Sequence, residues 1–198
     1  NSIQLSYATG FNNVTNFHDF KYNPGSAADA FGFGSASREL RSGVPDRVDD
    51  SNTEQVDRVT KNGFREDWRV KSRRPLWDQK FNFAINRKFD RENGDRFGLV
   101  GALNYSNTNK SFLNMENSRY GIYNGDEDTK NYSYKYTDNQ YTNDVKLGAM
   151  LNLSYLPAPK DENHINKYEF RNLFNQLGRN RYTEREGFQN ISGYYDQQ

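Results

Sequence analysis

The chain has 198 residues, of which 33% are hydrophobic and 15% aromatic, so phenylalanine and tyrosine supply much of its apolar content. A soluble core of this size normally draws on more leucine, isoleucine and valine, and a disordered chain should be poor in aromatic residues. The net charge of +1 excludes a general attraction to nucleic acid, and the lack of cysteine excludes disulfides and thiolate metal sites. A transmembrane β-barrel fits this composition, because alternate residues of each strand face lipid or a wet lumen.

The chain starts with an alternating segment that predicts a strand over residues 3–11. Ile3, Leu5 and Tyr7 fall on one face of this strand, and Gln4 and Ser6 fall on the other. No basic and apolar leader precedes it, so we expect the chain to be a processed or partial form of a longer exported protein. No run approaches the roughly 18 apolar residues of a membrane-spanning helix.

A long connection is expected over residues 22–75. It contains aromatic residues, namely Phe31, Phe33, Phe64 and Trp68, and it ends in a basic cluster formed by Arg69, Lys71, Arg73 and Arg74. Arginine geometry suits the phosphates of lipopolysaccharide, which would make the cluster a binding site. The alternative is a solvated loop end that is balanced by Glu66, Asp67 and Asp78.

Strict period-two alternation over residues 77–89, 97–105 and 145–155 predicts three more strands, the first two joined by a tight turn at residues 91–95. Their apolar face is predicted to meet lipid through Phe81, Phe83, Ile85, Leu99, Leu103, Leu147, Leu151 and Leu153. Their polar face is predicted to meet the lumen through Lys80, Asn82, Asn86, Asn104, Lys146 and Asn152. Aromatic residues at the strand ends are typical of interface belts, which we expect at Trp77, Phe89, Phe97, Tyr105 and Tyr155.

The connections alternate between long and short. Residues 22–75 and 114–141 are predicted long loops, whereas residues 91–95 and 156–163 are predicted short turns, the latter containing two prolines. A fifth strand is expected over residues 168–174 and a sixth near the C-terminus. Long extracellular loops and short periplasmic turns are typical of outer-membrane barrels.

The predicted fold class is therefore all-β, an antiparallel up-and-down transmembrane barrel segment of about five or six strands. A soluble β-sandwich with the same alternation is the alternative. Because the smallest transmembrane barrels need about eight strands, we expect the remaining strands to come from the same polypeptide or from other chains.

Ligand contacts are expected from aromatic residues in the two long loops. The candidates are Trp68, Tyr120, Tyr123, Tyr132 and Tyr134, with Tyr136 nearby. Such rings stack on sugars or clamp peptides, because they supply rigid contact area at a small entropy cost. Packing of loop against loop is the alternative.

No enzymatic site is expected. The sequence has no nucleophile motif, phosphate loop or dinucleotide fingerprint, so no catalytic residue and no cofactor is predicted. His18 and His164 are far apart in the sequence, which disfavours a zinc site. The acidic run at residues 126–128 offers oxygen ligands for a hard cation but lacks the spacing of a calcium loop, so an exposed loop tip is expected instead.

Several short segments resemble TonB-dependent receptors that carry a carboxypeptidase-regulatory-like extension. Residues 2–11 (SIQLSYATGF) and 15–20 (TNFHDF) are similar to the segment after the plug domain of that family, and residues 31–34 and 37–45 to its first outer loop. Residues 97–106 and 169–175 are similar to its third and fifth strands. The resemblance implies that residues 1–198 are the first part of a 22-stranded barrel, whose plug domain and other strands lie outside this chain.

The resemblance further implies active import across the outer membrane of a Gram-negative bacterium. The expected cargo is a large nutrient such as a glycan, a peptide or a metal chelate, and the expected energy source is TonB, contacted by a segment outside this chain. Expected partners are membrane lipid, lipopolysaccharide, the receptor's own plug and barrel, and a surface lipoprotein or other outer-membrane subunit; nucleic acid is not expected. Two alternatives stay open: a structural barrel subunit of a secretion or surface-lipoprotein assembly, and a soluble β-rich glycan-binding domain.

Overall fold

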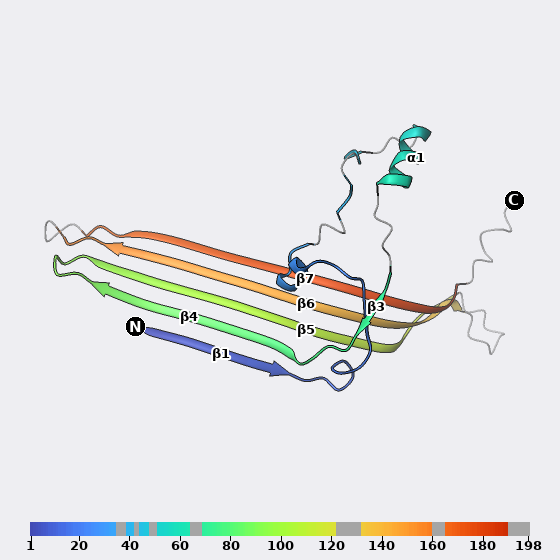
Figure 1. Ribbon diagram of the computed structural model, residues 1–198, viewed down its shortest axis with the longest axis horizontal. Coiled ribbons are helices and arrows are strands. Elements are labelled where there is room, and N and C mark those ends of the chain that lie inside the picture. Colours follow the sequence, from blue (N-terminus) through green and yellow to red (C-terminus); the bar gives the residue numbers. More distant parts are fainter. Residues whose placement is uncertain are drawn as a thin grey trace.

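The computed structural model describes residues 1–34, 39–41, 44–47, 51–63, 69–121, 132–159 and 165–189. Five strands form one antiparallel sheet, in which each long strand pairs with the next long strand along the chain (Figure 1). The predicted all-β class and the antiparallel, up-and-down strand order are confirmed. In sheet order the strands are β1 (Ser2–Gly10), β4 (Asp78–Asp90), β5 (Arg96–Tyr120), β6 (Tyr132–Leu156) and β7 (Tyr168–Gln189).

The sheet is open rather than closed. Within the described residues no strand pairs with the outer edge of β1 or of β7. Both edges therefore present backbone groups to which further strands could bond.

The connection between β1 and β4 contains the other elements. β2 (Phe20–Tyr22) pairs with β3 (Lys71–Arg73), and between them lie the 3-10 helix η1 (Ala27–Phe31) and the helix α1 (Thr53–Asn62). Asn52 caps α1, because its side chain accepts a hydrogen bond from the backbone N–H of Gln55 at 3.1 Å. In Figure 1, α1 stands clear of the sheet. None of the helices in the described ranges combines the length and the hydropathy that crossing a membrane requires.

Three strands are much longer than predicted. The expectation of a loop over residues 114–141 is wrong, because residues 114–120 belong to β5 and residues 132–141 belong to β6. The two strands stay paired from Arg96 and Leu156 to Tyr120 and Tyr132, with a register shift between Phe112 and Met115. These segments lack the apolar–polar alternation of the predicted strands, although Tyr132, Tyr134 and Tyr136 recur at every second residue. Pairing to a neighbouring strand satisfies their backbone groups.

The two short connections pack against each other at the other end of the sheet. The carboxylate of Asp95 accepts hydrogen bonds from the backbone N–H of Ala158 at 2.8 Å and from the hydroxyl of Tyr155 at 3.3 Å. Gly94 has a φ of 89°, and a Cβ there would lie 3.1 Å from that of Ala158. The Ala158 N–H, followed by the Asn93 side chain, lowers the pKa of Asp95 below its usual value of 3.8.

We expect this contact to make stability depend on pH. Because the folded pKa of Asp95 is lowered, its contribution is present above the ordinary aspartate pKa and is lost as the pH falls through the lower folded value. Urea unfolding of the wild type should therefore become easier between pH 5 and pH 2, and Asp95→Ala should show a smaller change over that range. Glu92→Ala in the same turn is the control. Equal acid sensitivity of wild type and Asp95→Ala would contradict the assignment.

Candidate functional site

Strand register places the predicted lipid-facing residues on a single face. Directly opposed residues of antiparallel strands share a face, and Phe83 is opposite both Leu5 and Leu103, while Leu99 is opposite Leu153. We call this side the apolar face. It holds all eight predicted residues, namely Phe81, Phe83, Ile85, Leu99, Leu103, Leu147, Leu151 and Leu153, together with Ile3, Leu5 and Tyr7 of β1 and Tyr168, Phe170 and Phe174 of β7.

Much of the apolar face is bare. Leu103, Leu151 and Leu153 remain 38%, 41% and 43% exposed, so the described part of the chain leaves them open to whatever surrounds the protein. Arg87 and Asn172 are polar members of this face, opposite Leu99 and Leu151 respectively. Nothing in the structure explains the position of Asn172.

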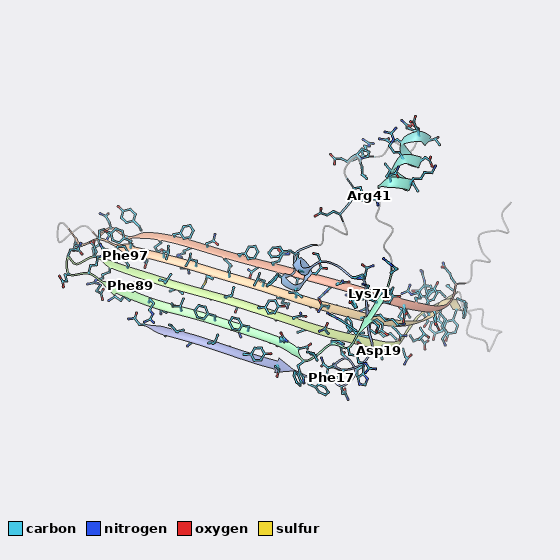
Figure 2. The ribbon with its side chains drawn as sticks, viewed as in Figure 1. Phe17, Asp19, Arg41, Lys71, Phe89 and Phe97 are labelled. Atoms are coloured by element: carbon cyan, nitrogen blue, oxygen red, sulfur yellow. The ribbon has the colours of Figure 1, made fainter. Side chains whose placement is uncertain are left out.

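A row of aromatic residues forms the border of the apolar face next to the short turns. Phe89, Phe97, Tyr155 and Tyr168 are successive partners across four strands. The ring centroids of Phe97 and Tyr155 are 4.6 Å apart, and those of Tyr155 and Tyr168 are 6.1 Å apart. Figure 2 shows Phe89 and Phe97 close together at this end of the sheet. Three of the five predicted belt residues thus meet in one row, to which strand pairing adds Tyr168.

The other two predicted belt residues take aromatic partners from the connection between β1 and β4. The hydroxyl of Tyr105 donates a hydrogen bond to the carbonyl of Ala30 at 2.8 Å, and its ring lies 6.3 Å from that of Phe31. Trp77 precedes β4 and meets the ring of Phe17 edge-on at 5.7 Å. Both therefore border the bare region on the side away from the short turns.

Residues 23–33, which we call the strap, cross the apolar face at this border. Besides the contact with Tyr105, the side chain of Gln176 donates a hydrogen bond to the carbonyl of Gly32 at 2.7 Å, and that of Asn180 to the carbonyl of Asn23 at 3.3 Å. Phe33 stacks on Phe174 at 6.3 Å. The strap therefore separates the bare region from the halves of β5, β6 and β7 that lie farther from the short turns, which we call their outer halves.

Two glycines allow the strap to approach the sheet. A Cβ at Gly178 would overlap the Cα of Gly32, and a Cβ at Gly32 would lie 2.9 Å from the backbone nitrogen of Gly178. Gly32 also has a φ of 81°, which other residues rarely adopt. Val145 is opposite Gly178 on the same face and is only 1% exposed. The strap thus turns part of the apolar face into a small buried core.

Two exposed arginines of the predicted basic cluster make contacts within the chain. The guanidinium of Arg73 lies 5.0 Å from the ring centroid of Tyr22 and donates a hydrogen bond to the side chain of Asn109 at 3.0 Å. Arg74 lies 3.6 Å from the carboxylate of Asp19. Lys71 is exposed. The contacts of the two arginines favour a structural role for them.

The opposite side of the sheet, which we call the polar face, holds the predicted lumen residues Lys80, Asn82, Asn86, Asn104, Lys146 and Asn152. Farther from the short turns, two arginines of β7 each form an ion pair with an aspartate of β6. Both distances from Arg185 nitrogens to the Asp138 carboxylate are 2.8 Å, and those from Arg179 to Asp144 are 2.6 and 3.2 Å. The hydrogen bonds from Arg185, and next that from Asn117, lower the pKa of Asp138. Such forked pairs hold geometry as well as charge.

A group of tyrosines lies at the outer end of the polar face. Tyr132, Tyr134 and Tyr136 alternate along β6 on the same side as Asp138. The ring of Tyr120 stacks on that of Tyr132 at 4.9 Å, that of Tyr134 stacks on Tyr136 at 5.2 Å, and Arg185 lies 4.7 Å from the Tyr136 ring centroid. Each stacked pair covers one face of each of its two rings, and Tyr120 remains 58% exposed.

The expected loop location of Tyr120, Tyr132 and Tyr134 is wrong, because they belong to strands β5 and β6. Their role as ligand contacts stays a prediction. Trp68, Tyr123 and Phe64 lie outside the described residues, as do His164 and the acidic run at residues 126–128. In the part of the chain that is described, no three carboxylate or histidine side chains gather where they could hold a metal ion.

Comparison of the chain with protein-family models, with curated proteins and with solved structures finds no match.

Proposed function

We propose that this chain is part of the wall of an outer-membrane β-barrel and that the complete protein is a TonB-dependent receptor importing a large nutrient. The observation that carries the first part is the bare apolar region, bounded by an aromatic row on one side and by Tyr105 and the strap on the other. In β5 the region runs from Phe97 to Tyr105.

The height of this region suits an outer membrane. Nine residues of β5, at roughly 3.4 Å each, span about 30 Å along the strand. A strand tilt of roughly 40° reduces this to about 23 Å, close to the roughly 25 Å height of the apolar band on outer-membrane barrels. The same height applies to β4 and β6, because their partners are in register.

The exposure of this face argues against a soluble sandwich. A sandwich buries one side of each sheet beneath a second sheet about 10 Å away, whereas Leu103 and Leu151, on the inner strands β5 and β6, are 38% and 41% exposed. Lipid is the medium that such a surface fits, with the polar face turned towards a wet lumen.

The outer halves of β5, β6 and β7 extend past the strap and would stand above the membrane. They present the tyrosines and the Arg185–Asp138 pair on the lumen side, where a ligand entering the barrel would pass. We propose that rings and hydroxyls of this group contact the ligand. The import role and its dependence on TonB rest on the family resemblance of the sequence.

The import role is tested by growth on single nutrients. Wild-type cells, cells without the complete receptor and cells without TonB are compared on single glycans, peptides and metal chelates. We expect both deletions to abolish growth on the same nutrient, and Tyr134→Ala with Tyr136→Ala to reduce its uptake. Tyr22→Ala, on β2 away from the tyrosine group, is the control variant.

If uptake continues without TonB, the import proposal is wrong. Loss of a surface-exposed assembly when the receptor is deleted, without loss of any nutrient, would favour the structural-subunit alternative. Recovery of the protein in the soluble fraction would overturn the membrane proposal itself.

A further inference from the structure

The apolar face has a groove at its border with the short turns. It has a volume of about 780 Å³, and its lining includes Phe97, Leu99, Leu153, Tyr155, Phe170 and Arg91. The walls are rings and branched aliphatic side chains, which offer contact to a flexible hydrocarbon chain and almost no hydrogen bonds. In a membrane this groove would lie at the level where acyl chains meet headgroups.

Positive charge stands beside the groove. The guanidinium of Arg91 lies over the Phe97 ring, 5.4 Å from its centroid. Arg87 is on the same face of β4, directly opposite the groove residue Leu99. Charged residues are rare on the lipid side of a strand. An arginine at such a position is therefore expected close enough to the interface for its guanidinium to reach the headgroups.

Two carboxylates near the groove have hydrogen-bond or ion-pair partners of their own. Glu169 borders the groove and pairs with Lys167 and with Arg171, the latter at 2.6 Å. Asp95 accepts hydrogen bonds from Ala158, Asn93 and Tyr155. Arg91 thus lines the apolar groove and Arg87 lies on the same face of β4, and this arrangement complements an anionic headgroup that is attached to an acyl chain.

We propose that this groove is a phospholipid site, in which an acyl chain lies along Leu99 and Leu153 and Arg87 and Arg91 bind the phosphate. The site rests on the proposed membrane location and would lie in the leaflet next to the short turns. A phospholipid held there would anchor this border of the wall.

The test uses the complete receptor, purified in detergent and titrated with phosphatidylglycerol, with bound lipid counted by native mass spectrometry. We expect the wild type to retain one phosphatidylglycerol, and Arg87→Gln with Arg91→Gln to weaken its binding on the order of tenfold, through loss of charge-assisted hydrogen bonds. Arg96→Gln is the matched control, because Arg96 ends the same turn but points to the polar face, near Asp90. Unchanged retention in the double variant would overturn the site.

A second arm needs no variant. Diacylglycerol, which lacks the phosphate, should fail to displace the retained lipid, and glycerol phosphate, which lacks the acyl chains, should also fail. Displacement by either compound would show that the acyl chains alone or the phosphate alone suffices for binding, and it would refute the proposed site. A receptor that forms a heat-modifiable barrel but retains no phospholipid would refute the site alone, whereas a chain that never enters the membrane would refute the proposed function with it.

Discussion

Replacing Gly178 with alanine is expected to lift the strap off the sheet. The added methyl group would overlap the Cα of Gly32, and neither backbone segment has a flexible side chain that could give way. Overpacking of this kind typically costs about 1–3 kcal/mol. The strap should therefore open roughly ten to a hundred times more often.

Opening can be read at Val145, which is 1% exposed beneath the strap. The chain has no cysteine of its own, so Val145→Cys supplies a single thiol in this segment. We expect this thiol to resist labelling in the otherwise unchanged protein and to react at least tenfold faster when Gly178→Ala is added. Gly34→Ala is the control, because a Cβ at Gly34 has nothing within 4 Å. Equal protection in the Gly178→Ala and Gly34→Ala backgrounds would show that the strap does not depend on this close approach.

Charge placed on the apolar face should be far more damaging than the same charge one residue away. Leu151 is opposite Gly101, midway between the two borders of the bare region, and Asn152 is its neighbour on the polar face. An arginine facing lipid at the middle of a barrel wall costs about 2–4 kcal/mol. Leu151→Arg should lower the free energy of unfolding from phospholipid vesicles by that amount, and Asn152→Arg should change it by less than about 1 kcal/mol.

The complete protein is used, and the heat-modifiable band on a gel reports how much of each variant has assembled. A stronger effect of Asn152→Arg than of Leu151→Arg would mean that the polar face, and not the apolar face, meets lipid. Similar small effects would mean that neither face meets lipid.

The alternating residues by themselves determined which segments contain strands and which side chains share a face. In residues 77–89, 97–105 and 145–155 apolar and polar residues alternate so regularly that any strand pairing would have placed Phe83, Leu99 and Leu151 on the same sides of their strands. The tight turn at residues 91–95 then joined β4 and β5 as neighbours. Local information was enough, because the period of a strand and the length of a turn are local properties.

Strand ends were decided by the tertiary structure. Residues 106–120 and 132–144 are mostly polar on both faces, and the alternation of Tyr132, Tyr134 and Tyr136 does not extend through the rest of these segments, so the local pattern distinguishes them poorly from a loop. They are strands because each finds a partner in the other, and β7 pairs along the far side of β6. Beyond the first residue of β4, the edge of β5 has no strand partner on that side, and side chains accept hydrogen bonds from its backbone instead. Asp78 accepts from the N–H of Asn109, and Thr15 accepts from the N–H of Ser111, both at 2.9 Å.

The borders of the candidate membrane surface also required the fold. Each aromatic residue of the row is visible in the sequence, but only register aligns Phe89, Phe97, Tyr155 and Tyr168 across four strands. The strap depends on Gly32 meeting Gly178, a contact between residues 146 positions apart, and nothing in either local sequence indicates the other. The alternation of apolar and polar residues can be found in the local sequence. Strand register, the covering of strand edges and the close approach of two backbones depend on distant segments that compete for the same hydrogen bonds and the same space.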